Sequence, residues 1–329
     1  MTSSKSLQQA IADITIWRKG EQRAPHKPLL LLHVLAAGLQ CENKDFTLQT
    51  LGTGGPITDD QRASSGEVIW LNGKSAILID AGGGIFLRFG QSGARLEDLK
   101  LIAISHFHTD HVSDLAPILK GGYFLKDKES INLAGPQGGG AFPSMTQYFD
   151  ALFKKEKGAY AYLNGLYNAT DGLQLAMNIK DINYTASEPQ LVYQDDEMKV
   201  TALGIPHGDV PCLAFRIDTA KGTIVVSADQ NGSNSAFIHF AKGADMLVMP
   251  LAIDEDTDDT SKFIHAAPDV VGKVAAQINP KVLVLNHFMG KGLRLKDQSI
   301  DIVKQYYHGP VYSSRDLSCF PISLANTKE

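Results

Sequence analysis

The chain has 329 residues, of which 43% are hydrophobic and 20% charged; this is typical of a globular protein with a large core and argues against bulk disorder. The formal net charge of −5 provides no overall attraction for nucleic acid, although a basic face is compatible with that balance. Cys41, Cys212 and Cys319 are far apart and form no CxxC pair, so we expect free thiols and no disulfide.

Residues 1–44 are predicted to form a helical leader of unknown role. Its apolar run, Pro28–Leu39, is shorter than the roughly 18 residues of a membrane span. The run fits a packing helix better than a secretory signal, because a long polar stretch precedes it and His33 interrupts it. We therefore expect a cytoplasmic protein, with a periplasmic location as the alternative if residues 28–39 act as a signal. The opening from Trp17 to Leu32 resembles certain bacterial DNA-binding restriction-type proteins but carries no chemistry.

Short strands interleaved with helices predict one α/β domain over residues 45–329. Asn72-Gly73 is a hairpin turn signal between two of these strands. Helical spacing is found at Leu115–Leu119 and Ala267–Ile278. The predicted strands are Phe46–Leu51, Val68–Leu71, Ala76–Asp80, Leu101–Ile104, Lys199–Leu203, Leu213–Ile217, Thr223–Ser227, Met246–Met249 and Val282–Leu285.

Residues 121–195 interrupt this alternation and are rich in aromatic side chains. One interpretation is a helical subdomain with its own small core. The other is an apolar cover over an active site, and the two are compatible. We expect an aromatic-rich helical insertion that covers the site.

The strongest chemical signal is the sequence His106-Phe107-His108-Thr109-Asp110-His111, which follows a predicted strand. Three imidazoles and a carboxylate are brought close together by this spacing. Imidazole nitrogen and carboxylate oxygen are ligands that suit a borderline divalent metal such as zinc. The motif therefore predicts a metal site.

Three further ligand candidates lie at the ends of later strands. His207, Asp229 and His287 each follow an apolar segment. A single histidine at a strand end is more often structural than functional. Active sites of open α/β layers gather at the ends of strands, however, so the shared position favours convergence on one site.

The order HxHxDH, His, Asp, His resembles the metallo-β-lactamase superfamily over roughly residues 46–315. Leu51-Gly52-Thr53-Gly54-Gly55-Pro56 and Leu78-Ile79-Asp80-Ala81-Gly82 are similar to its early glycine and aspartate motifs, and the opening loop is similar to the ribonuclease Z and arylsulfatase branch. The resemblance implies a four-layer αββα fold with two zinc ions per chain. It implies that one zinc is bound by His106, His108 and His207, the second by Asp110, His111 and His287, and that Asp229 bridges them.

His265 stands where ribonuclease Z-like enzymes have a histidine that helps to protonate the leaving group, although the hydroxyl residues that usually follow are absent. His287-Phe288-Met289-Gly290 also departs from the continuation found in tRNA-processing members. The resemblance implies catalytic roles for Asp110 and His265. For His265 a purely structural role is the alternative, and Asp80 is expected to orient a ligand.

These features predict a metal-dependent hydrolase in which zinc-bound hydroxide attacks a small, largely apolar electrophile. The motif order, length and aromatic segment resemble bacterial isothiocyanate hydrolases, which implies detoxification to an amine and carbonyl sulfide. Phosphodiesterase, arylsulfatase and lactonase activities are alternatives, and tRNA 3′-processing is a weaker one. A non-enzymatic alternative is a DNA-associated protein directed by residues 1–44. We expect a small-molecule substrate, no nucleic acid or membrane partner, and a homodimer as one oligomeric option.

Overall fold

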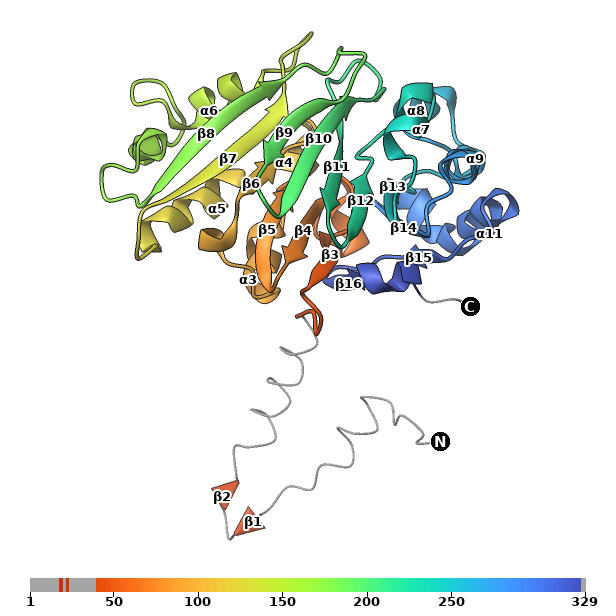
Figure 1. Ribbon diagram of the computed structural model, residues 1–329, viewed down its shortest axis with the longest axis horizontal. Helices are drawn as coiled ribbons and strands as arrows, with labels where there is room; N and C mark the ends of the chain where they lie inside the picture. The colour runs from red at the N-terminus through yellow and green to blue at the C-terminus, as the bar shows by residue number, and fades with distance from the viewer. Residues whose placement is uncertain (1–17, 20–21, 24–39, 327–329) are drawn as a thin grey trace.

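The computed structural model describes residues 18–19, 22–23 and 40–326 (Figure 1). Most of the predicted leader, including the apolar run 28–39, lies outside the described residues. Its described part pairs two short strands, β1 (Arg18–Lys19) and β2 (Gln22–Arg23), where a helix was expected. Gly20 separates these pairs in the sequence and is a poor helix former.

The first sheet has the strand order β16-β3-β4-β5-β6-β7-β8. Its early strands form antiparallel hairpins, and β5 to β8 are parallel. The strands are β3 (Phe46–Gly52), β4 (Gly66–Leu71), β5 (Lys74–Ile79), β6 (Leu101–Ala103), β7 (Glu129–Pro136), β8 (Leu175–Ile182) and β16 (Ser318–Pro321).

The second sheet has the order β15-β14-β13-β12-β11-β10-β9. Strands β9 to β12 are antiparallel, and β12 to β15 are parallel. The strands are β9 (Gln190–Gln194), β10 (Met198–Gly204), β11 (Leu213–Thr219), β12 (Gly222–Val226), β13 (Met246–Pro250), β14 (Val282–Asn286) and β15 (Val311–Ser313).

The two sheets pack face to face, and helices cover their outer faces, which confirms the expected four-layer αββα fold (Figure 1). The first sheet is covered by α3 (Ile85–Gln91), α5 (Leu115–Lys120) and α6 (Met145–Phe153). The second is covered by α7 (Ser235–Ala241), α9 (Pro268–Ile278) and α11 (Lys296–Tyr306). The other α-helices among the described residues are α4 (Thr109–Val112), α8 (Asp259–Ile264) and α10 (Gly290–Arg294).

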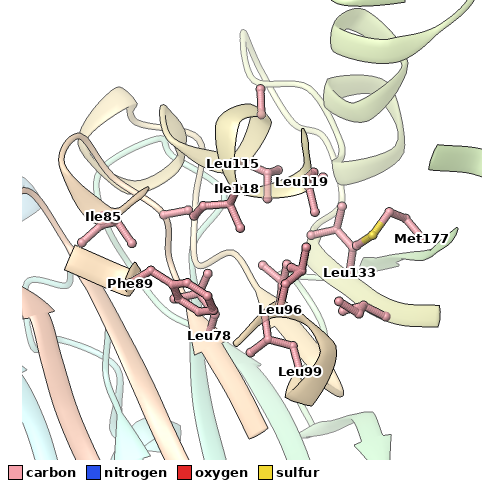
Figure 2. Packing of buried hydrophobic residues seen from close by; sticks show 14 of the residues in the cluster. Leu78, Ile85, Phe89, Leu96, Leu99, Leu115, Ile118, Leu119, Leu133 and Met177 are labelled. Carbon is pink, nitrogen blue, oxygen red and sulfur yellow. The ribbon is translucent and has the colours of Figure 1, made fainter. Parts of the chain in front are cut away.

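Alternation along the strands explains the layering, because successive side chains point to opposite faces of a sheet. In β5, Ile77 and Ile79 pack into the core between the sheets, whereas Leu78 packs outward. Figure 2 shows Leu78 meeting Phe89 of α3 on that outer side. Strands of this kind are apolar on both faces, which is why the sequence contains continuous apolar runs rather than strict alternation.

The segment 121–195 is only partly helical. Its strands β7 and β8 extend the first sheet, and β9 is an edge strand of the second. Helix α6 is amphipathic and starts with a capping box, in which Ser144 and Gln147 exchange hydrogen bonds. Its buried side chains belong to the main outer core, so the segment is integrated in the fold and has no separate core.

The expectation of free thiols was wrong for two of the three cysteines. Cys41 and Cys319 form a disulfide, and only Cys212 is a buried free thiol among the described residues. A strand pairing brings the two cysteines together: β16, which contains Cys319, pairs antiparallel with β3, which begins five residues after Cys41. This long-range pairing joins cysteines 278 residues apart and has no signature in local cysteine spacing.

The acidic run at 254–259 is only partly solvated. Asp254 is buried and pairs with Lys291 at 2.5 Å, and Asp258 caps α8 by accepting a hydrogen bond from the Ser261 backbone. In the described part of the chain, no helix is long and apolar enough to cross a membrane.

Candidate metal centre

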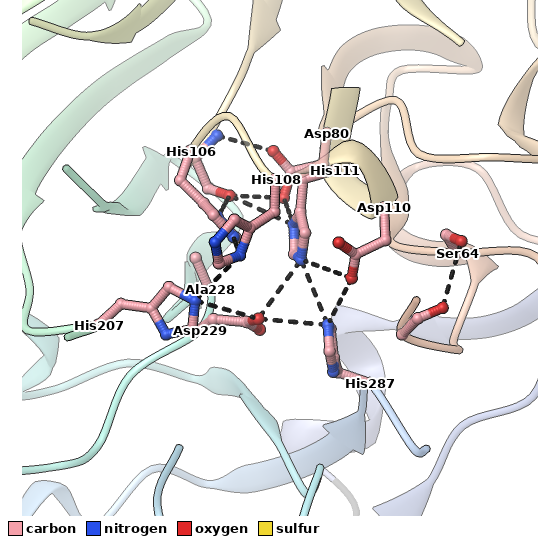
Figure 3. Close-up of polar contacts among 12 residues, drawn as sticks. Ser64, Asp80, His106, His108, Asp110, His111, His207, Ala228, Asp229 and His287 are labelled. Atoms are coloured by element: carbon pink, nitrogen blue, oxygen red, sulfur yellow. Dashed lines mark hydrogen bonds and ion pairs between the residues drawn. The ribbon is translucent and has the colours of Figure 1, made fainter. Parts of the chain in front are cut away.

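The predicted ligands converge where strand ends of the two sheets face each other (Figure 3). The first sheet contributes the loop after β6, which continues into the single turn α4. The second contributes the ends of β10, β12 and β14. The side chains brought together are His106, His108, Asp110, His111, His207, Asp229 and His287.

One group of three imidazole nitrogens lies on the His108 side. Nε2 of His106 is 3.1 Å from Nδ1 of His108, and Nε2 of His207 is 3.3 Å from the same Nδ1. His106 and His207 are buried, and His108 is half-buried. This group, the first triad, is open to solvent through His108.

A second group lies deeper. Nε2 atoms of His111 and His287 are 3.2 Å apart, and Oδ2 of Asp110 lies 3.6 and 3.4 Å from them. All three side chains of this second triad are buried. Oδ2 of Asp229 lies 3.4 Å from His111, 3.2 Å from His287 and 3.9 Å from Nε2 of His207, so it stands between the two triads.

These donors fit metal ions. Two ligands bound to one zinc at tetrahedral angles are about 3.4 Å apart, because zinc–nitrogen bonds are roughly 2.0–2.1 Å long. Five of the six donor pairs within the triads are separated by 3.1 to 3.6 Å. Imidazole and carboxylate form the donor set that zinc accepts. The protein therefore has two adjacent groups of candidate ligands, with Asp229 between them.

Contacts behind the ligands fix several of them. Oδ2 of Asp80 accepts a hydrogen bond from Ser105 Oγ at 2.7 Å and lies 2.8 Å from Nδ1 of His111. Ser105 Oγ is also 3.0 Å from Nδ1 of His106. Nδ1 of His207 is 2.7 Å from the carbonyl oxygen of Ile264, to which it donates. Such contacts hold the ring orientation and leave the other nitrogen for a metal.

Three non-glycine residues at the strand ends have left-handed backbone conformations. Asp80 follows β5 with φ 57°, Ala228 precedes Asp229 with φ 51°, and His287 follows β14 with φ 52°. Such conformations are uncommon for these residues and cost free energy. They turn the chain sharply at the point where a strand reaches the site.

His265 lies beside the ligands, at the end of α8 and before α9. Its Nδ1 is 4.0 Å from Oδ2 of Asp229, and its ring centre is 5.2 Å from that of His207 and 5.6 Å from that of His287. Burial lowers the pKa of His265 to about 4. The ring is therefore neutral at pH 7 and can donate a hydrogen bond from one nitrogen.

The sequence reasoning missed several residues around the ligands. Ser105, Glu67 and Asn286 form buried contacts behind them. Each is a polar residue next to a strand end, which was the only available signal. Apolar residues near the ligands include Phe142, Phe263 and Met289, of which Phe142 lies in the aromatic segment expected to cover the site.

The sequence profile of the Beta-lactamase superfamily domain matches residues 75–288. The chain belongs to the β-lactamase superfamily. It is thus a hydrolase of a metal-binding fold, as the motifs predicted. It is 25% identical to a ribonuclease Z of Nocardia farcinica over 307 residues, which cover 84% of this chain and 97% of that protein.

Two solved structures share the fold with this member of the superfamily. One is the metallo-β-lactamase fold protein YhfI of Bacillus subtilis, with a TM-score of 0.64, 20% identity, and coverage of 84% of this chain and 98% of that one. The other is the short form of human tRNase Z, with a TM-score of 0.64, 20% identity, and coverage of 84% and 99%.

Proposed function

We propose that the protein is a dinuclear zinc hydrolase acting on a small, largely apolar electrophile. The observation that carries this proposal is the apolar surroundings of the triads. The ring of Phe142 is 5.8 Å from that of His108. Phe263, which is 54% exposed, packs against Gly208, the residue after His207. A Cβ added to Gly208 would be only 3.2 Å from the Phe263 ring. Apolar walls with a few convergent polar groups are typical of small-molecule sites.

Charge near the site favours an uncharged substrate over RNA. The acidic run 254–259 leads into α8, whose end carries Phe263 and His265. Negative charge at this position repels a phosphate backbone, whose binding depends on lysine and arginine. This feature, with the net charge of −5, supports a small substrate against tRNA 3′-processing.

The residues divide the proposed chemistry between them. Two bound zinc ions would supply an activated water and neutralise developing negative charge. The six triad residues and Asp229 would hold these ions. His108, the half-buried ligand, marks the side from which substrate approaches. His265, with a neutral ring beside Asp229, is placed to pass a proton to the leaving group.

Within this class we propose an isothiocyanate as substrate. Addition of water to the central carbon of R–N=C=S, followed by cleavage of the carbon–nitrogen bond, yields an amine and carbonyl sulfide. The amine nitrogen needs a proton as it leaves, which is the role proposed for His265. Phosphodiesters, aryl sulfates and lactones are electrophiles for the same attack by water and are the alternative substrates.

A substrate panel tests the proposal. The zinc-loaded protein is assayed on benzyl isothiocyanate, bis-p-nitrophenyl phosphate, an aryl sulfate, a lactone and a precursor tRNA. We expect kcat/KM to be highest for the isothiocyanate, and Asp110→Ala to abolish turnover. Preferred turnover of the precursor tRNA would contradict the proposal. Retention on DNA that depends on salt and on residues 1–44 would support the non-enzymatic alternative.

The Cys41–Cys319 disulfide bears on the cellular compartment of the protein. The expected cytoplasmic location stays a prediction, and the Cys41–Cys319 disulfide supports the periplasmic alternative, because disulfides persist in oxidising compartments. Mass spectrometry of the protein isolated from cells, with thiols blocked before lysis, measures both the disulfide and any cleavage after residues 28–39. The homodimer also stays a prediction.

A further inference from the structure

Glu67 is a buried carboxyl group between the sheets that the ligand set does not use. It is 2% exposed. In β4, Ile69 and Leu71 share its face and pack into the core between the sheets, whereas Val68 and Trp70 pack outward. Glu67 pairs in register with Ile79, the residue before Asp80. It therefore lies at the end of the inter-sheet core that is nearest the metal centre.

Asn286 meets Glu67 from the opposite sheet. In β14, Val282 and Val284 pack into the same inter-sheet core, and Asn286 continues that face. Its Nδ2 donates a hydrogen bond to Oε1 of Glu67 at 2.6 Å, and both side chains are buried. The contact joins residues 219 apart in sequence and lies immediately before His287.

His287 differs from the other buried histidines of the triads at its second ring nitrogen. Among the described residues, no group forms a hydrogen bond with its buried Nδ1, whereas Nδ1 of His106, His111 and His207 each has a partner. Metal-binding histidines are usually oriented through that second nitrogen. The orientation of His287 therefore depends on its backbone, which has φ 52°.

Three contacts hold that backbone on its two sides. The carbonyl oxygen of Asn286 accepts from Leu251 N at 2.8 Å, and Phe288 N donates to the carbonyl oxygen of Thr53 at 2.8 Å. The third is the side-chain bond from Asn286 to Glu67. It ties the end of β14 to β4, whereas the Thr53 bond ties Phe288 to the residue after β3, and both strands belong to the sheet that supplies Asp110 and His111.

Packing alone does not account for a carboxyl group at this position. Burying a polar side chain costs free energy that an apolar residue, such as those neighbouring it in β4, would not incur. Burial, followed by the charge of Asp80, raises the pKa of Glu67 to about 8. The carboxyl group is therefore largely neutral at pH 7 and can accept from Asn286 without adding charge beside Asp80.

We propose that Glu67 is a positioning residue that acts through Asn286 to hold His287 against the first sheet, and so sets the geometry of the second triad. The inference rests on the proposed role of His287 as a metal ligand. It predicts that the second zinc depends on residue 67 although this side chain contacts no ligand atom.

The test measures zinc binding to the metal-depleted full-length protein by competition with a chromophoric chelator. Glu67→Leu removes the acceptor, and we expect it to weaken one zinc equivalent by about 10- to 100-fold while changing the other little. Asn286→Ala should weaken the same equivalent, and it serves if Glu67→Leu does not fold. Glu67→Gln keeps a neutral acceptor and should retain near-normal affinity.

Two control variants separate the possible failures. Ile69→Ala opens a cavity on the same face of β4, and it should lower the urea midpoint of unfolding without selective loss of one zinc. Equal weakening in Ile69→Ala and Glu67→Leu would overturn the positioning role. His287→Ala should remove the same zinc equivalent. Normal zinc binding by His287→Ala would contradict the role of His287 as a ligand. Loss of one zinc in His287→Ala together with normal zinc binding by Glu67→Leu would overturn only the role proposed for Glu67.

Discussion

The two triads differ in exposure and in electrostatics. In the first triad, burial lowers the pKa of His106, His108 and His207, so these rings are neutral nitrogen donors. In the second, burial alone would lower the pKa of His111, but the carboxylates of Asp229 and Asp80 raise it well above its ordinary value.

The second triad is thus the acidic and enclosed one, and the first is neutral and open through His108. The difference indicates two roles. A zinc ion bound in the buried second triad would need nearby negative charge, because a buried charge without a partner of opposite sign is costly. The carboxylates beside the histidines provide that negative charge. The open triad is the one next to Phe142, where we propose that substrate approaches.

The largest effect is expected where the triads meet. Asp229→Ala should remove most bound zinc and lower kcat/KM by more than about 10⁴-fold, since the carboxylate serves both ligand sets. Elemental analysis and kinetics on the same preparation measure this. A variant that keeps two metals per chain would show that Asp229 does not bridge.

Single-triad variants should separate the two sets. His207→Ala and Asp110→Ala should each weaken one different zinc equivalent and abolish turnover for every substrate, because the activated water is lost. Isothermal titration of the metal-free variants with zinc counts the remaining sites. Loss of the same equivalent in both variants would contradict the assignment of two separate triads.

A smaller and selective effect is expected for His265→Ala. The variant should keep its zinc but slow reactions with basic leaving groups by about 10²- to 10⁴-fold, because such groups need a proton. Leaving groups such as p-nitrophenolate depart as anions and should be affected much less. A series of substrates with graded leaving-group pKa measures the trend. A uniform penalty, or loss of zinc, would return His265 to a structural role.

The smallest effect is a pH dependence of stability. The pKa of His265 falls from 6.5 to about 4 on folding, so the unfolded chain takes up the proton first as the pH drops. As the pH falls from 6.5 to about 4, protonation of this group should lower the free energy of unfolding of the metal-free protein by up to about 1.4 kcal/mol per pH unit. Above pH 6.5 this group should cause no change. Urea unfolding of wild type and His265→Asn from pH 7.5 to 4.5 isolates the difference. Parallel curves would contradict a buried neutral His265.

The positions of the strands along the chain and the convergence of the candidate ligands were predictable from sequence, because each candidate follows a locally recognisable strand. The nine predicted strands all occur, with ends shifted by one or two residues. The HxHxDH spacing keeps its members close together. His207, Asp229 and His287 reach the same site because the strands that precede them end at the same edge of the second sheet. The family resemblance added the division into two triads.

Features made by long-range contacts could not be predicted in this way. The Cys41–Cys319 disulfide depends on β16 returning to β3, and the Glu67–Asn286 bond depends on the packing of two sheets. A glutamate within an apolar strand such as β4 carries no sign of its partner 219 residues away. The strands of segment 121–195 were missed because their polar residues obscure the apolar pattern, as in β8, where Asn178 and Lys180 interrupt it.

The most direct test of the account is the metal content of the purified, active protein. Elemental analysis with parallel activity measurements should give about two zinc ions per chain, with activity lost on chelation and restored by zinc. A folded protein that hydrolyses its substrate at full rate without any bound transition metal would contradict the account.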